Sequence, residues 1–122
     1  LLRGFFVRPT LVADVTSDMR IVREEVFGPV ITIQGYDSEE QAIEMANDSE
    51  FGLAAGIFTL SEDRAIEIAL RLDAGNISMN LSSGSFQLPF GGYKKSGIGR
   101  EGGFAGVEEL LQWKQVQQKR TG

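Results

Sequence analysis

The sequence predicts an α/β fold built on a mostly parallel sheet, with a β-α-β-α-β core. Three short apolar runs, at residues 30–35, 54–59 and 76–80, alternate with two stretches of helical periodicity. Strands that alternate with helices are typical of parallel sheets joined by right-handed crossovers. We therefore expect the three strands to run parallel to one another.

The first strand, residues 30–35, is entered through a Gly-Pro pair and left through a Tyr-Asp pair, which are typical turn residues. Ser38 follows as a helix N-cap, and Gln41 stands three residues later in a capping-box arrangement. Residues 47–52 should end this helix. Its apolar positions are Ala42, Ile43 and Ala46.

The same pattern repeats directly after the second strand. Ser61 is expected to cap a second helix, and Gly75 to mark its C-terminal stop before the third strand at 76–80. The apolar positions of this helix recur at i, i+3, i+4 and i+7, which predicts one buried face. They are Ala65, Ile68, Ala69 and Leu72.

Three strands and two helices cannot cover both faces of a parallel sheet. The missing cover must come from the termini, from a partner, or from the rest of a longer chain, and the apolar opening at Leu1 favours the last of these. In such sheets, ligands bind beyond the carboxyl ends of the strands. The loop that leaves the third strand there, residues 81–88, runs into a glycine-rich stretch at 89–101.

Composition limits the possible functions. The net charge of −5 argues against a nucleic-acid partner, which requires concentrated Lys and Arg. The absence of Cys and His excludes a disulfide scaffold and a thiolate metal site, and removes the usual general base. No transmembrane run or signal peptide is visible, so we expect no membrane contact and a cytoplasmic location.

Two motifs have simple structural interpretations. Gly97, Gly99 and Gly102 satisfy GxGxxG, but no apolar strand precedes them and no acidic residue follows at the required distance. We interpret them as a glycine turn; a small dinucleotide-binding protein built on them is the alternative. Glu24 and Glu25, taken alone, indicate a solvated, ion-paired face.

Three consecutive segments carry a family resemblance: EEVFGPV at 24–30, NDSEFGLAAGIFT at 47–59 and PFGGYKKSGIGRE at 89–101. In order and spacing they resemble the C-terminal part of the catalytic domain of the NAD(P)-dependent aldehyde dehydrogenase superfamily. The resemblance implies that residues 1–112 are a C-terminal segment of that domain. Residues 113–122 would be a tail leading toward a strand used in oligomer contacts.

The resemblance also implies roles for particular residues. Glu25 would bind the hydroxyls of the nicotinamide-side ribose of NAD or NADP, and Phe27 would pack near the nicotinamide. Phe90 would form part of the wall of the aldehyde-binding tunnel, with the 81–88 loop at its mouth. Asn80 does not correspond to the family's oxyanion-stabilising asparagine, and we expect it to cap a turn.

In the family, a cysteine thiolate attacks the aldehyde, a hydride passes to the nicotinamide, and a glutamate activates the water that releases the acid. This sequence has no Cys, so the nucleophile and the general-base Glu are expected upstream. The chain alone should then be inactive, and the parent enzyme should be a homo-oligomer. The alternative is a stand-alone, non-catalytic α/β module that acts as a degenerate subunit or an interaction partner.

Overall fold

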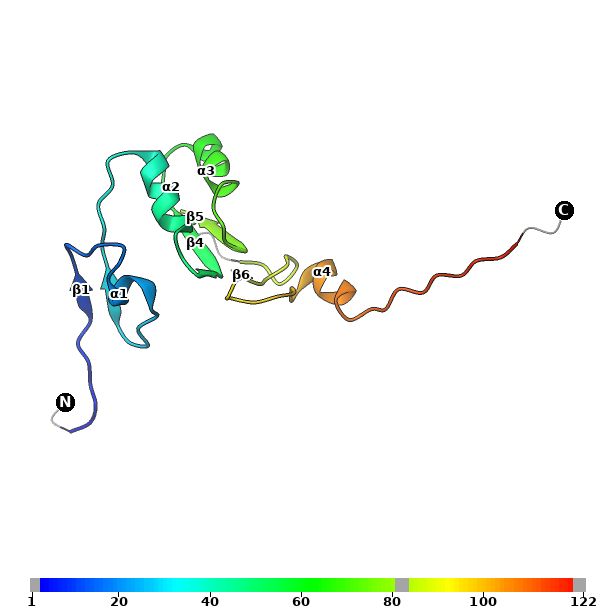
Figure 1. Cartoon of the computed structure of the whole chain (residues 1–122), viewed down its shortest axis with the longest axis horizontal. Coiled ribbons are helices and arrows are strands. Elements are labelled where there is room, and N and C mark those ends of the chain that lie inside the picture. Colours follow the sequence, from blue (N-terminus) through cyan, green and yellow to red (C-terminus); the bar gives the residue numbers. More distant parts are fainter. Residues whose placement is uncertain (1–2, 81–83, 120–122) are drawn as a thin grey trace.

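The computed structural model describes residues 3–80 and 84–119 of the chain. Figure 1 shows the helices and strands gathered in the middle, with an extended segment leading away at each end. The elements, in chain order, are β1 Thr10–Val12, α1 Arg20–Arg23, β2 Val30–Thr32, α2 Glu39–Asn47, β3 Phe51–Gly52, β4 Ala54–Ile57, α3 Glu62–Ala69, β5 Asn76–Met79, β6 Tyr93–Lys94 and α4 Gly103–Glu108.

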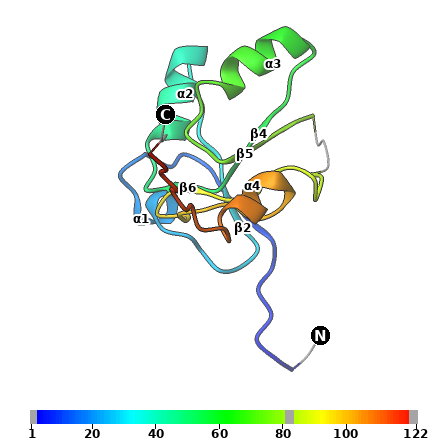
Figure 2. The same cartoon turned by 90° about the vertical axis from the view of Figure 1, so that its right-hand side faces the viewer.

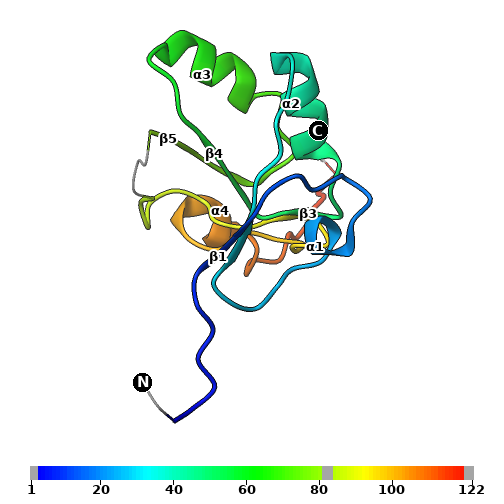
Figure 3. The same cartoon turned by 90° about the vertical axis from the view of Figure 1, so that its left-hand side faces the viewer.

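The strands of residues 3–80 and 84–119 form three two-stranded sheets. β4 and β5 pair in parallel, and so do β1 and β2, whereas β3 and β6 are antiparallel. Helices α2 and α3 lie on the same side of the β4–β5 pair (Figures 2 and 3). The predicted α/β class with parallel pairing is confirmed, and the three predicted strands begin at the expected residues.

The expectation of three parallel strands in one sheet is wrong for the first strand. β2 pairs with β1, and the ladder extends from the Thr10 N–H, which donates to Pro29 O at 2.8 Å, to the Ile33 N–H, which donates to Val12 O at 2.9 Å. β1 was not predicted because three residues are too few to show a strand pattern. In the described part of the chain, β4 has a partner strand on one edge only, β5.

Both predicted N-caps are confirmed. The Gln41 N–H donates to Ser38 Oγ at 3.2 Å, and the Gln41 side chain accepts from the Asp37 N–H at 2.6 Å. The Arg64 N–H donates to Ser61 Oγ at 3.3 Å. Each cap satisfies an N–H group that the first helical turn leaves without a backbone partner.

Gly75 does not end the second helix, since α3 stops at Ala69. The chain tightens there into three-residue turns, in which the Arg71 N–H donates to Ile68 O at 2.9 Å. Gly75 lies instead at the entry to β5, where a Cβ atom would come within 1.8 Å of Gly91 O. The glycine is therefore required by the close approach of the 89–101 segment to the sheet.

The apolar core is small. Among the described residues, the buried apolar side chains are Val15, Ile43, Ile57 and Ala65. Other large apolar side chains lie on the surface, at least 95% exposed: Phe5, Leu60, Phe86, Ile98 and Trp113. Extensive exposed apolar surface is typical of interaction sites, which agrees with the expectation that the sheets need additional cover.

Charged pairs join the two helices that lie beside β4–β5. Arg64, on α3, bonds both Glu39 and Glu67, and Arg71 bonds Glu40 in the first turn of α2. The hydrogen bond from Arg71 holds the pKa of Glu40 below its usual value of 4.5. The acidic residues in the first turn of α2 thus interact favourably with the helix dipole, and they also bond Arg64 of α3 and Arg71 beyond it.

Gly75→Ala tests the close approach at the entry to β5. Because the clash is with a backbone carbonyl, we expect the free energy of unfolding to fall by about 1–3 kcal/mol or more. Gly35→Ala is the matched control, because nothing lies within 4 Å of a Cβ atom at Gly35. Urea denaturation of the two variants measures the difference, and equal midpoints would contradict the packing described here.

Glu40→Gln tests the link between α2 and Arg71, in the turn that follows α3. A carboxyl with a lowered folded-state pKa stabilises the protein above its unfolded-state pKa, and that contribution is lost as the pH falls through the folded-state value. The variant should therefore unfold at lower temperature than the native chain near neutral pH, with the gap closing below about pH 4. Glu44→Gln is the control, because the Glu44 carboxylate has no partner among the described residues; a gap independent of pH would refute the pairing.

Candidate functional site

The Glu24–Glu25 pair follows directly on the short helix α1. The Glu24 N–H donates to Arg20 O at 2.8 Å and closes the helix, and Glu24 itself is extended. The chain then turns at Gly28, whose N–H donates to Val26 O at 2.8 Å, and enters β2. The two carboxylates thus lie on an exposed connection between a helix end and a strand.

The two carboxylates have different surroundings. Glu24 accepts two hydrogen bonds from the Arg20 guanidinium, both at 2.8 Å, and this bonding lowers the pKa of Glu24. The solvated, ion-paired interpretation is therefore correct for Glu24. Glu25 makes no hydrogen bond or ion pair with any residue that the structure describes, and its side chain lines a pocket of about 370 Å³.

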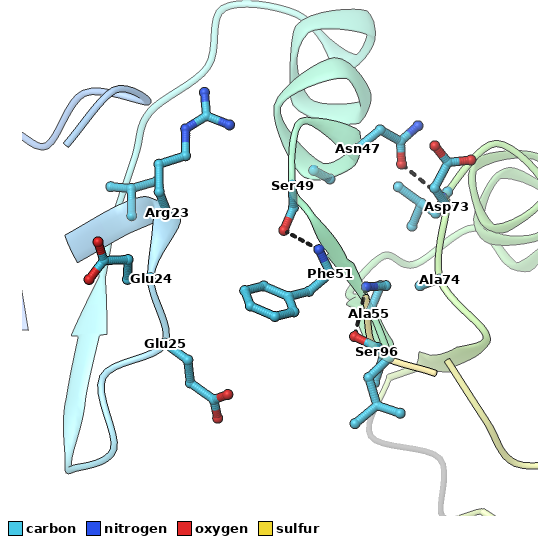
Figure 4. Close-up of a pocket in the computed structure, with 16 residues that line it drawn as sticks. Arg23, Glu24, Glu25, Asn47, Ser49, Phe51, Ala55, Asp73, Ala74 and Ser96 are labelled. Atoms are coloured by element: carbon cyan, nitrogen blue, oxygen red, sulfur yellow. Dashed lines mark hydrogen bonds between the residues drawn. The ribbon is translucent and has the colours of Figure 1, made fainter. Parts of the chain in front are cut away.

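Figure 4 shows this pocket, with Glu24 and Glu25 extending to different sides of the chain. Across from Glu25 are the end of α2, strands β3 and β4, and the loop before β5. The other polar side chains labelled in Figure 4 already have partners: Arg23 with Asp48, Glu24 with Arg20, Asn47 with Asp73, Ser49 with Phe51, Asp73 with Lys94 and Ser96 with Gly52. Among these labelled polar side chains, Glu25 alone makes no hydrogen bond or ion pair with a described residue.

Phe27 and Phe90 lie outside the Glu25 pocket. The Phe27 side chain is 93% exposed and does not line the pocket. Phe90 is 52% exposed and lines two neighbouring pockets, of about 400 and 510 Å³. The first shares Leu53 and Ser96 with the Glu25 pocket, and the second shares Ala54 and Ala55 with it. Glu25 and Phe90 thus lie on adjoining surfaces.

Phe90 is held by the glycine-rich segment. The Phe90 and Glu101 backbones exchange two hydrogen bonds of 2.7 Å, which closes the intervening residues into a loop. The Arg100 guanidinium lies 5.3 Å from the Tyr93 ring centroid and donates to Gly92 O and Gly99 O inside that loop. Phe90 therefore lies at the base of a closed, internally bonded loop.

The GxGxxG glycines are accounted for by backbone geometry. Gly99 and Gly102 have φ angles of 85° and 73°, and residues other than glycine rarely adopt such values. A Cβ atom at Gly102 would lie 2.9 Å from Leu88 O. These observations favour the interpretation as a structural turn.

Asn80, which was predicted to cap a turn, bonds a distant residue in the described part of the chain: its partner, Thr59, is 21 residues away. Asn80 has a φ of 51°, a conformation that Asn tolerates better than most residues. Its side chain accepts from the Thr59 N–H at 3.0 Å and donates to Thr59 O at 2.9 Å. It thereby ties together the carboxyl ends of β4 and β5. Of the loop that follows, residues 81–83 lie outside the described residues.

Sequence reasoning missed the partners of Asp48 and Glu50. Asp48 bonds Arg23 at 2.6 Å, and Glu50 bonds Lys95 at 2.7 Å. These partners are 25 and 45 residues away in sequence, so no local spacing indicates them. The described residues contain no group of three or more potential metal ligands, and none of their helices is long and apolar enough to cross a membrane.

Comparison with known proteins gives a consistent result. The model of the aldehyde dehydrogenase family matches residues 1–116. Over 115 residues the chain is 48% identical to betaine aldehyde dehydrogenase of Brucella melitensis, covering 93% of this chain and 24% of that protein. It is also 48% identical over 115 residues to an aldehyde dehydrogenase of Enchytraeus buchholzi, with 93% and 23% covered.

Solved structures agree with the sequence matches. An aldehyde dehydrogenase of Mycobacterium tuberculosis complexed with NAD+ superimposes with a TM-score of 0.86 at 48% identity, covering 89% of this chain and 23% of that one. A variant of aldehyde dehydrogenase C of Pseudomonas syringae, complexed with NAD+ and octanal, gives 0.86 at 45% identity, with 89% and 22% covered. The chain spans about a quarter of the length of the relatives it matches. It belongs to the aldehyde dehydrogenase family.

Proposed function

We propose that this chain works as the C-terminal catalytic-domain segment of a longer aldehyde dehydrogenase that oxidises an aldehyde to a carboxylic acid with NAD+ or NADP+. Within it, Glu25 binds the hydroxyls of the nicotinamide-side ribose. One observation carries this proposal. The Glu25 carboxylate lies on a pocket and has no partner among the described residues, whereas the other polar side chains labelled in Figure 4 are bonded.

The chemistry of Glu25 suits a ribose. An ionised carboxylate is an acceptor only, with two oxygens that can each take a hydroxyl proton. Glu24 is less available for this role, because each of its oxygens already accepts a hydrogen bond from Arg20. The comparison structures contain NAD+, which supports this class of ligand. When bound, the nicotinamide supplies the hydride acceptor, and Glu25 orients it by fixing the adjoining ribose.

Phe27 and Phe90 are proposed to act only when further protein covers them. Phe27 presents almost its whole ring to the surface, suited to packing against a flat, apolar ring such as the nicotinamide. Phe90 lines the pocket bounded by Ser78, Ser85 and Leu88, which we assign to the aldehyde tunnel. The exposed apolar surface supports this arrangement and the proposed homo-oligomer of the complete enzyme.

The reacting nucleophile and the base are assigned to the remainder of the proposed longer enzyme. The chain has neither Cys nor His, so no thiolate is available within it to attack a carbonyl. In this proposal its own residues bind, orient and exclude water, and they form no covalent bond to the substrate.

Glu25→Gln in the complete enzyme tests the ribose role. Since a hydrogen bond to a charged group is worth about 1.5–3 kcal/mol, we expect the hydride step to slow by roughly ten- to a hundredfold. Glu24→Gln is the matched control, because it removes only the neighbouring pair with Arg20, and its rate should stay near the native value. Single-turnover measurement of cofactor reduction gives both rates, and an unchanged rate for Glu25→Gln would remove Glu25 from the site.

The 122-residue chain alone should not oxidise aldehydes, because it offers no nucleophile. Purified chain is mixed with an aldehyde and NAD+ or NADP+, and the absorbance of the reduced cofactor is followed over time. We expect no signal above a blank without protein. Sustained turnover would overturn the assignment of the nucleophile to another part of the enzyme.

A further inference from the structure

Arg23 and Asp48 form a two-point contact between distant parts of the chain. Arg23 Nη1 donates to the backbone oxygen of Asp48 at 2.8 Å, and Nη2 donates to its carboxylate Oδ2 at 2.6 Å. Two bonds from one planar guanidinium fix an orientation as well as a distance. The bonding raises the pKa of Arg23 and lowers that of Asp48, so both groups are charged at neutral pH.

The contact lies beside the Glu25 pocket. Arg23 is the last residue of α1, two residues before Glu25, and it lines the pocket with Glu25. Asp48 is the C-cap of α2 and stands between Asn47 and Ser49, which line the opposite wall. The guanidinium is also favourably placed against the negative end of the α2 dipole.

The end of α2 is itself fixed from the other side. Lys94 Nζ donates to Asn47 O at 2.7 Å, and the Asn47 side chain donates to Arg71 O and accepts from the Asp73 N–H, both at 2.8 Å. Arg23 therefore joins the end of α1 to the C-terminal end of α2, which is itself bonded to β6 and to the loop before β5.

The Glu25 segment has little support of its own. Residues 24–29 are all exposed. Apart from the Thr10 N–H bond to Pro29 O at the entry to β2, the backbone bonds described for them are short-range turn contacts. An exposed segment held mainly by local turns can change its angle to the rest of the molecule at small cost. The position of Glu25 relative to the opposite wall should then depend on the contact made at Arg23.

We propose that Arg23 and Asp48 are positioning residues, which hold the Glu25 carboxylate at the distance from the β3–β4 wall that NAD(P)+ binding requires. Neither touches the cofactor; both act through Glu25, so the inference rests on the ribose role proposed above. The pair makes cofactor affinity depend on a contact between the end of α1 and the end of α2.

The test compares two neighbouring arginines of α1 in the complete enzyme. Arg23→Gln breaks the contact with Asp48, whereas Arg20→Gln breaks the more exposed pair with Glu24, which lies on one side of the pocket and makes no contact across it. We expect the Kd for NAD+, measured by calorimetry, to rise about three- to tenfold in Arg23→Gln and to stay unchanged in Arg20→Gln. Asp48→Asn keeps the backbone bond, and should give a smaller rise in the same direction even if Arg23→Gln fails to fold.

A double-mutant cycle with Glu25→Gln separates positioning from general destabilisation. If Arg23 acts through Glu25, then Arg23→Gln should add no further loss of NAD+ affinity in the Glu25→Gln background. If Arg23→Gln raises the Kd for NAD+ by the same factor in the native and Glu25→Gln backgrounds, the inference is overturned. It is also overturned if Glu25→Gln raises the Kd but Arg23→Gln and Arg20→Gln have the same Kd. An unchanged Kd and hydride rate in Glu25→Gln would instead refute the ribose role, and the positioning role with it.

Discussion

The C-terminal end of α2 makes the polar contacts on which the relative placement of α1, β6 and the loop before β5 depends. Asn47 bonds the loop before β5 through its side chain and Lys94 of β6 through its backbone oxygen. Asp48, the next residue, bonds Arg23 at the end of α1. Three parts of the chain that share no continuous sheet are joined here, by charged and polar groups rather than by a core. The surfaces that carry Glu25 and Phe90 adjoin for this reason.

The small core and the exposed aromatic side chains are consistent with such an arrangement. The four buried apolar residues among those described offset only part of the conformational entropy of ordering a chain of this length. The chain spans about a quarter of the length of its relatives, and we propose that the rest of a longer aldehyde dehydrogenase covers the exposed apolar side chains. The polar contacts at the end of α2 set the geometry of the surface that would meet it.

What could be predicted from the sequence was mostly local. Ser38 and Ser61 were predicted because a helix cap requires a particular residue type within a few positions of its partner. The partner of Asn80, Thr59, is 21 residues away and was not predicted. The pairing of β1 with β2, and the contact of Arg23 with Asp48, join residues 20 or more apart whose spacing carries no period. Such contacts depend on how the elements come together, which pattern reasoning on one sequence does not give.

The candidate site shows the same division. The EEVFGPV motif selected Glu25 by resemblance, and the structure explains why the two adjacent glutamates differ, since Arg20 occupies Glu24 and no described residue bonds Glu25. No local spacing indicates that Arg23 bonds across the pocket. Phe27 was selected by the same motif, and the structure leaves it 93% exposed, outside the Glu25 pocket.

The most direct test is a crystal structure of the complete enzyme with bound NAD+ or NADP+. The account predicts Glu25 carboxylate oxygens at hydrogen-bonding distance, about 2.5–3.0 Å, from the hydroxyls of the nicotinamide-side ribose, with the Arg23–Asp48 contact intact. A Glu25 side chain bonded to another protein group, with the ribose held elsewhere, would contradict it.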